Sequence, residues 1–375
     1  MMKSHYDTIV VGGGPAGSTC ATLLARGGHN VALIDKARFP RDKICGDCVN
    51  PRCWDIFELL GVADILQSQP LQIVTAVGIS NASGRRIFTE LPTSGSRPFF
   101  SIKRSVLDTI LLRNAERAGV HVFEETLLTD VHGEGPWETV LQGKRRLTCD
   151  ILVGADGRNS LVARKLHAVR GVTRSATART RDNRVGIQWH AGFQHAVNSS
   201  VEMFLFDHGY GGVVNVDRET ANVAMVTTTG TVSSKPFSEF LDRTLYQNAR
   251  AKQLFPRLDP VGKISITYPI TPSHHGSAHS SAILIGDANR TVEPFTGEGI
   301  FFALQDGVNA SRRILKSERQ LPETIFDRRG TRFWANHIYS PTLQLHRPAG
   351  LLVSVAAAFP SLVPAAMKAI IPANK

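Results

Sequence analysis

Apolar residues near the start of the chain fall into short runs, separated by a glycine-rich turn and an amphipathic stretch. Tyr6–Val11 and Val31–Asp35 are such runs, and Pro15–Arg26 between them has helical spacing. Short apolar runs bounded by turns are typical of buried parallel strands. The order strand, glycine turn, helix, strand therefore predicts the first unit of a doubly wound α/β fold.

The same buried-strand pattern returns twice, far along the chain. Asp150–Asp156 and Ser281–Asp287 are apolar runs that end in a glycine turn with an aspartate. Ser105–Ala118 and Gly299–Ile314 have helical spacing of apolar residues, which indicates helices packed against a sheet. We therefore expect one parallel sheet to collect its strands from segments that are widely separated in sequence.

Two intervening stretches have a different pattern. Ile73–Phe88 and Val185–Val226 alternate apolar and polar residues between turn signals, which is typical of antiparallel strands. The sequence thus predicts an α/β chain with a discontinuous Rossmann-like dinucleotide-binding domain, an inserted antiparallel β-sheet substrate domain and a C-terminal helical segment. We expect the dinucleotide-binding domain to comprise residues 1–70, 101–168 and 272–330. The substrate domain would comprise residues 71–100 and 169–271, and the C-terminal helical segment residues 331–375.

The run Gly350–Met367 near the C-terminus contains no charged residue. Its length approaches that of a membrane-spanning helix, but Pro360 and Pro364 would break or kink such a helix. We therefore expect a helical pair that covers a hydrophobic pocket or dips into a membrane surface. The chain enters a strand directly after its first residues, without room for a secretion signal, so we expect a cytoplasmic protein with peripheral membrane contact as an option.

The composition is that of an ordinary globular protein, with 42% hydrophobic and 20% charged residues. Five cysteines, an odd number, argue against a disulfide framework. Part of the net charge of +11 is local, because seven cations lie between Arg164 and Arg184 against one acid, Asp182. This basic run can face anionic lipid, a phosphorylated dinucleotide, an acidic carrier or only solvent. It contains no aromatic residue and the chain has no helix-turn-helix or finger signature, so we expect no nucleic-acid partner.

Gly12, Gly14 and Gly17 form a GxGxxG motif between the first strand and the first helix, with Pro15 and Ala16 inside it. The first glycine permits the tight turn, the second lets the backbone approach a pyrophosphate, and the third lets helix and strand pack closely. The phosphates then lie at the helix N-terminus, where unpaired N–H groups favour anions. The motif therefore predicts a bound dinucleotide.

Asp35 follows Gly17 by eighteen residues, at the end of the second strand, with Lys36 beside it. A carboxylate there can accept hydrogen bonds from ribose hydroxyls. No second GxGxxG of this type occurs in the chain. One dinucleotide is therefore expected to be resident, and any nicotinamide to bind transiently.

Several later motifs resemble those of a known superfamily when they are taken together with VVGGGPAGS. They are KICG at 43–46, Arg104 before a helix, GADGRNS from Gly154 and GDANRTVEPFTGEGI from Gly286. With these motifs the chain resembles the single-FAD monooxygenase superfamily of the aromatic hydroxylase type, over most of residues 6–315. Within it, the resemblance is to the branch shared with geranylgeranyl reductases and flavin-dependent halogenases. It implies FAD as the resident dinucleotide and NAD(P)H as a transient electron donor.

The resemblance also implies roles for individual residues. Asp35 would bind the adenosine ribose, Arg104 would lie near the phosphates or the ribityl chain, and Asp287 would hold the ribityl or the pyrophosphate. Pro294–Ile300 would line the isoalloxazine, with the helix N-terminus at Gly299 stabilising reduced flavin. The full set of expected cofactor-binding residues is Gly12, Gly14, Pro15, Ala16, Gly17, Asp35, Lys36, Cys45, Gly46, Arg104, Asp156, Gly157, Gly286, Asp287, Pro294, Gly297, Gly299 and Ile300.

Three cysteines lie close together in the sequence. Cys45 and Gly46 match the Cys-Gly that the resemblance places beside the flavin, while Cys45 and Cys48 also form a CxxC followed by Cys53. A redox pair is the alternative to pocket lining, but no histidine cluster accompanies these cysteines and we expect no metal. Cys20 and Cys149 are expected in the core.

Three flavin chemistries share this scaffold: hydroxylation through a flavin C4a-hydroperoxide with O2, reduction of isoprenoid double bonds, and halogenation. The halogenase GWxWxIP motif is absent, since the comparable stretch is GYGGVVNVD at 209–217. In the YxWxFP-type motif of the reductases, Tyr210 is present, but Gly212, Val214 and Asn215 replace Trp, Phe and Pro. Hydroxylation remains by elimination, with reduction as the alternative and a non-catalytic or nucleic-acid-interacting flavoprotein as the least favoured class.

The reacting groups are the least defined part of the sequence. Cys45, His190 and Tyr210 are candidate catalytic residues by location only, as is His208, and each can equally be an ordinary core or sheet residue. The uncharged C-terminal run and apolar segments such as Pro98–Phe100 fit a lipophilic or aromatic substrate: a phenolic lipid, polyketide or isoprenoid. We expect a monomer or dimer.

Overall fold

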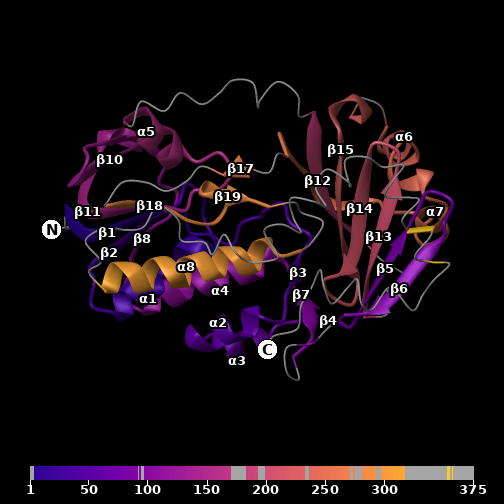
Figure 1. The fold of residues 1–375 in the computed structure, drawn as a ribbon, viewed down its shortest axis with the longest axis horizontal. Helices are drawn as coiled ribbons and strands as arrows, with labels where there is room; N and C mark the ends of the chain where they lie inside the picture. Colours follow the sequence, from indigo (N-terminus) through magenta and orange to yellow (C-terminus); the bar gives the residue numbers. More distant parts are fainter. Residues whose placement is uncertain are drawn as a thin grey trace.

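Two large sheets, side by side, form the body of the molecule (Figure 1). The computed structural model describes residues 4–91, 93, 97–169, 183–192, 199–232, 236–270, 273–274, 281–292, 297–316, 353–354 and 357. Within these residues each large sheet has seven strands. The expected α/β fold class is confirmed.

The first sheet collects strands from distant parts of the chain. Its order is β8 (His121–Phe123), β2 (Val31–Ile34), β1 (His5–Val11), β11 (Arg146–Gly154), β10 (Trp137–Leu141) and β9 (Leu128–His132). β18 (Ala282–Leu284) pairs with β11 in parallel, with Leu152 opposite Ala282. β8, β2, β1 and β11 are also parallel to one another. β10 is antiparallel to both of its neighbours, β11 and β9.

Helices on one face of this sheet bury its apolar side chains. α1 (Pro15–Arg26), α4 (Arg104–Arg117) and α8 (Gly299–Leu315) lie together there (Figure 1). α5 (Leu161–Val169) packs on the other face, and α2 (Cys53–Leu59) and α3 (Ala63–Gln67) pack beneath α4 and α8. α8 crosses α1 closely, because Gly307 has no side chain of its own and faces the Ala16 carbonyl and the Thr19 side chain directly.

The second sheet has the order β16 (Pro260–Thr267), β12 (Arg184–Gly192), β15 (Thr220–Thr228), β14 (Gly209–Asn215), β13 (Ser200–Phe206), β5 (Ala76–Ser80) and β6 (Arg86–Glu90). It is antiparallel, as expected, except that β13 and β5 are parallel. Parallel pairing is possible here because the two strands are joined by a long excursion through the first sheet.

One face of the second sheet is covered and the other faces the first sheet. α6 (Phe237–Asp242) and α7 (Ala249–Leu254) cover the far face, where Trp189 and Phe204 are completely buried. Because side chains alternate along a strand, the neighbours of Trp189 on β12, Gln188 and His190, point to the opposite face.

A three-stranded sheet of β3 (Cys48–Val49), β7 (Phe99–Ser101) and β4 (Gln72–Val74) lies between the two large sheets. The remaining short elements are β17 (Ser273–His274), β19 (Arg290–Thr291), η1 (Gln142–Lys144), η3 (Thr229–Thr231), η4 (Leu245–Gln247) and η5 (Gly286–Ala288). All strands of the first large sheet fall within residues 5–154 and 282–284, and those of the second within 76–90 and 184–267. The domain boundaries themselves stay a prediction.

Two features of the sequence lie mostly outside the described residues. Of the basic run, residues 170–182 are not described, while Arg164 donates to the Asn159 carbonyl and Lys165 pairs with Asp130 at 2.6 Å. Of the uncharged C-terminal run, only residues 353–354 and 357 are described. No helix in the described part of the chain is long and apolar enough to cross a membrane.

The close crossing of α1 and α8 predicts that a single methyl group added at this contact lowers the stability of the protein. A Cβ at Gly307 would lie 2.6 Å from the Ala16 carbonyl oxygen, so Gly307→Ala should lower the free energy of unfolding by about 1–3 kcal/mol through overpacking. Urea denaturation measures this loss. Gly230→Ala is the control, since a Cβ there meets nothing within 4 Å and should change stability by no more than about 0.5 kcal/mol. Equal stability of the two variants would contradict the close crossing.

Candidate functional site

The turn between β1 and α1 is closed too tightly for side chains at two of its glycines. A Cβ at Gly17 would lie 1.9 Å from the Gly12 carbonyl oxygen, and one at Gly12, whose φ is +108°, would lie 2.3 Å from the Ala155 oxygen. Gly14 differs, because the nearest atom to its Cβ position is an Arg41 nitrogen at 3.6 Å. Among the described residues no side chain caps α1, so its N-terminal N–H groups face this open space and can bind a phosphate.

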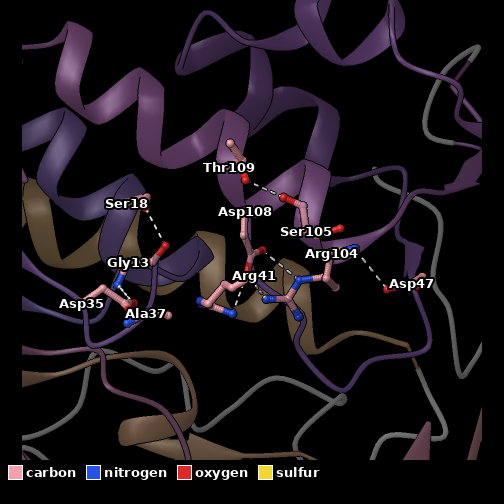
Figure 2. A network of polar contacts seen from close by, with 10 residues as sticks. All are labelled: Gly13, Ser18, Asp35, Ala37, Arg41, Asp47, Arg104, Ser105, Asp108 and Thr109. Carbon is pink, nitrogen blue, oxygen red and sulfur yellow. Dashed lines mark hydrogen bonds and ion pairs between the residues drawn. The ribbon is translucent and has the colours of Figure 1, made fainter. Parts of the chain in front are cut away.

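Asp35 fixes the same turn from the end of β2. Its carboxylate accepts hydrogen bonds from the Gly13 N–H at 2.7 Å and from the Ala37 N–H at 2.8 Å (Figure 2). Each carboxylate oxygen keeps a further lone pair, which is available to a ribose hydroxyl. Lys36 beside it is exposed, and its expected contact with the cofactor stays a prediction.

A buried carboxylate on α4 holds two arginines in place. Asp108, completely buried, accepts two hydrogen bonds of 2.9 Å from Arg104, and Arg41 lies 3.3 Å from the same group (Figure 2). The bidentate pair between Arg104 and Asp108 joins positions four residues apart on a helix, where side chains meet naturally. Burial raises the pKa of the Cys45 thiol, and the nearby guanidinium of Arg104 opposes this increase.

Cations gather beside this arginine pair. The pKa of Lys43 is lowered, first by burial within the surrounding protein and then by Arg104, Arg41 and Arg158, against the attraction of Asp287. Lys43 is nevertheless open to solvent on one side. An excess of cations around one aspartate, next to an uncapped helix, fits the negative charge of a pyrophosphate. The residues present thus fit FAD.

Asp156, the aspartate of the GADGRNS motif, has a structural role. Asp156 accepts hydrogen bonds from the Ser160 hydroxyl at 2.5 Å and from the Leu161 N–H at 2.6 Å, and so caps the N-terminus of α5. Burial raises its pKa, which these bonds oppose. Gly157, with φ of +82°, follows next to Lys43. Contact of Asp156 or Gly157 with the cofactor stays a prediction.

The last motif brings α8 against the first turn. Gly286 would place a Cβ 3.0 Å from the Ala16 side chain, and its N–H donates to the buried Asp306 at 3.0 Å, which sets the turn that carries Asp287. Cβ positions at Gly297 and Gly299 meet nothing within 4 Å, so the backbone at the start of α8 is open to a flat ring. Ile300 is buried in the α2–α8 core. Pro294 lies outside the described residues.

The Cys45–Asp47 loop joins the first sheet to the second. Asp47, 1% exposed, accepts a hydrogen bond from the Arg104 N–H at 3.3 Å and lies 3.0 Å from Nε2 of His190 on β12. Asn222, opposite His190 on β15, donates to the Cys45 carbonyl at 2.7 Å. Two neighbouring side chains of the second sheet therefore hold the loop that is expected to lie beside the flavin.

Of the other cysteines, Cys48 is half-buried, and Cys20, Cys53 and Cys149 are buried. Burial raises the pKa of Cys48 to about 12 and that of Cys53 further, and all five cysteines are free. No group of His, Cys, Asp or Glu suited to a metal exists in the described ranges. Cys20 and Cys149 lie in the cores on either side of the first sheet, as expected.

The remaining candidate residues are not brought to the Cys45–Asp47 loop. Tyr210 is buried in an apolar cluster with Leu205, Val226, Ile270 and Val353. His208 is exposed at the turn between β13 and β14. This apolar cluster lies on the face of the second sheet that is directed to the first sheet.

Four polar residues of the site were absent from the expected set: Arg41, Lys43, Asp47 and Asp108. The spacing of Arg104 and Asp108 was the one local signal available, since i,i+4 ion pairs are visible in a sequence. Asp47 and His190 are 143 positions apart, and no local pattern links them.

Gly14 and Gly17 of the first turn should respond differently to the same substitution. Gly14→Ala leaves the unfolding free energy of the protein unchanged but should raise the Kd for FAD at least tenfold, because its methyl group enters the space in front of α1. Gly17→Ala should lose both stability and FAD binding. Flavin absorbance and urea denaturation separate the two effects. A Gly14→Ala variant that binds FAD with unchanged affinity would show that the cofactor does not lie there.

Comparison with known proteins identifies the cofactor. The profile of the family described as FAD binding domain matches residues 5–328. The menaquinone reductase of Mycolicibacterium smegmatis is 29% identical over 321 residues, which cover 82% of this chain and 75% of the relative. The geranylgeranyl diphosphate reductase of Rhodobacter capsulatus is 27% identical over 328 residues, which cover 83% and 76%.

A solved structure has the same fold. The flavin-dependent brominase Bmp2 superposes with a TM-score of 0.71 over 98% of this chain and 93% of its own, at 19% identity. The family match, the open glycine turn and the cations beside it agree on one cofactor. The chain belongs to the FAD binding domain family and is an FAD-dependent oxidoreductase.

Proposed function

We propose that this flavoenzyme reduces a carbon–carbon double bond in a lipophilic, prenyl-bearing substrate. The observation that carries the proposal is the pair between His190 of β12 and Asp47 of the Cys45–Asp47 loop. Reduced FAD, when bound, supplies a hydride to one alkene carbon. The other carbon then needs a proton, and the chain has to provide it from a group between the flavin and the second sheet.

His190 is the group best placed for this proton. Its Nε2 lies 3.0 Å from Asp47, whose carboxyl is almost completely buried. Burial raises the pKa of the Asp47 carboxyl, and the hydrogen bond to His190 opposes this increase. Because Nε2 faces Asp47, Nδ1 is the nitrogen that can give a proton to the alkene carbon, and the proton is restored from solvent because the His190 side chain is 24% exposed.

The nature of the substrate rests on two further observations. The relatives that cover more than four-fifths of this chain include reductases named for menaquinone and for geranylgeranyl diphosphate, and both compounds carry prenyl groups. The face of the second sheet directed to the first carries Tyr210, Leu205 and Val226 in one apolar cluster. This cluster lies on the same face of the second sheet as His190, and its apolar side chains suit contact with a prenyl chain. NAD(P)H is the proposed electron donor.

A monooxygenase is the second candidate, and β14 favours it. Gly212, Val214 and Asn215 stand where the reductases that the chain resembles carry Trp, Phe and Pro. In the structure Val214 and Asn215 are buried beside the Phe99–Ser101 strand, with Asn215 accepting a hydrogen bond from Ser101. The absence of the aromatic pair leaves this strand suited to a wider, aromatic substrate. Such an enzyme would use O2 and NAD(P)H to hydroxylate a phenolic lipid or polyketide.

One experiment distinguishes these reactions. The FAD-loaded enzyme, reduced with one equivalent of dithionite without O2, is mixed with geranylgeranyl diphosphate, which has no quinone ring that dithionite could reduce, and the product is analysed by mass spectrometry. We expect the substrate to gain two hydrogen atoms under these conditions. A product that forms only with O2 and carries one added oxygen atom would establish hydroxylation instead.

The role of His190 has a separate test. His190→Gln should lower kcat by about 10²-fold or more, the usual contribution of a general acid, and leave the Kd for FAD unchanged. His208→Gln is the matched control, since this histidine is exposed at a turn away from the loop. Equal kcat values for both variants would remove His190 from the mechanism.

A further inference from the structure

Glu298 is a buried carboxylate at the start of α8 whose charge is poorly compensated. The residue is 4% exposed, and its Oε1 has no hydrogen-bond partner. It occupies the N-cap position of α8, but its side chain makes no capping hydrogen bond. Buried carboxylates in proteins are normally paired or hydrogen-bonded, so this one has a cost that a structural role does not explain.

Two arginines act on Glu298 from a distance. Arg52, before α2, and Arg290, on β19, attract the carboxylate, but neither forms an ion pair with it within 4.0 Å. Their guanidinium groups instead lie over the rings of neighbouring phenylalanines, Arg52 at 4.0 Å from Phe301 and Arg290 at 4.8 Å from Phe302. Both arginines are therefore held beside the start of α8 independently of the charge on Glu298.

The other charges near Glu298 act through these arginines. Asp306 and Glu298 both attract Arg290, and Asp55 and Glu298 both attract Arg52; Asp287 acts on Asp306 in turn. Burial raises the pKa of Glu298 to about 7, against the two arginines. Asp306 has a pKa raised similarly, but it accepts the Gly286 N–H and is fixed in a turn. Of the two, Glu298 is the acid whose oxygen is not hydrogen-bonded.

The location of Glu298 links it to the flavin. Gly297 and Gly299 on either side leave the backbone open, and the N-terminus of α8 is directed toward the second sheet (Figure 1). A helix N-terminus stabilises a nearby negative charge. A carboxylate at the same point competes for that stabilisation with any negative charge that develops on the flavin ring.

We propose that Glu298 takes up one proton when FAD is reduced and releases it when FAD is reoxidised. Two electrons from the donor and one proton convert bound FAD into its anionic reduced form. The new negative charge lies near the carboxylate, so a second proton from solvent binds Glu298 and neutralises it. The net charge around the start of α8 is thereby kept constant. The N-terminus of α8 then stabilises only the negative charge of the reduced flavin.

The proton uptake can be measured without turnover. In a two-electron couple each coupled proton changes the midpoint potential by about 30 mV per pH unit. The potential of the FAD-loaded wild-type protein, titrated with dithionite and mediators, should fall by about 60 mV per pH unit just above pH 7, since two protons are bound there. Glu298→Gln should fall by about 30 mV per pH unit in the same range, because only the flavin proton remains.

A control variant and a second reading keep the test decisive. Glu219→Gln removes an exposed carboxylate and should keep the wild-type slope. A wild-type slope for one proton above pH 7 would overturn the proposal on its own, even if Glu298→Gln failed to bind FAD. A Glu298→Gln slope that still corresponded to two protons would also overturn it. Neither reading depends on which substrate the enzyme reduces or hydroxylates.

Discussion

Asp47 is the residue on which the relation of the two sheets depends. Its buried carboxylate is shared between the N-terminus of α4, through the Arg104 N–H, and β12 of the second sheet, through His190. Its carbonyl accepts the Ile102 N–H at 3.0 Å. Breaking a buried pair on one side typically costs about 3–5 kcal/mol, because the other charge is left uncompensated. The Cys45–Asp47 loop therefore cannot move away from either sheet cheaply.

The same loop connects the binding of the cofactor to the chemistry. Arg104 reaches Asp108 with its guanidinium and Asp47 with its backbone, so the residue that belongs to the cation group also fixes the loop. Asn222 and His190 are cross-strand neighbours, and they hold Cys45 and Asp47 respectively. A change in charge on the flavin side can thus reach the second sheet through two hydrogen-bonded residues.

The parts of the site that the sequence predicts are those built from local constraints. The strand–turn–helix geometry around Gly12 and Gly17 follows from close backbone approaches within a few residues, and Arg104 and Asp108 meet because they are one helical turn apart. Asp156 lies at the expected strand end, but its oxygens cap α5, because an unpaired helix N-terminus five residues away competes for them. The local sequence thus predicts where a side chain such as that of Asp156 lies, but not which groups it hydrogen-bonds.

Contacts between distant segments account for what could not be predicted. Asp47 meets His190 only because β12 is placed next to the loop by the assembled second sheet, and the parallel pairing of β13 with β5 depends on the same assembly. The two arginines that act on the buried carboxylate of Glu298, Arg52 and Arg290, likewise come from separate elements.

Three buried acids, Asp108, Asp47 and Glu298, differ in the cations that surround them. Asp108 is buried with two arginines in direct contact and has the structural role of holding them in place. Asp47 is buried with one histidine, so a proton can be exchanged within the pair. Glu298 is buried with its cations at a distance, so the proton itself becomes the partner. The number and distance of cations around each carboxylate, rather than its burial alone, separate the structural acid from the two that can handle protons.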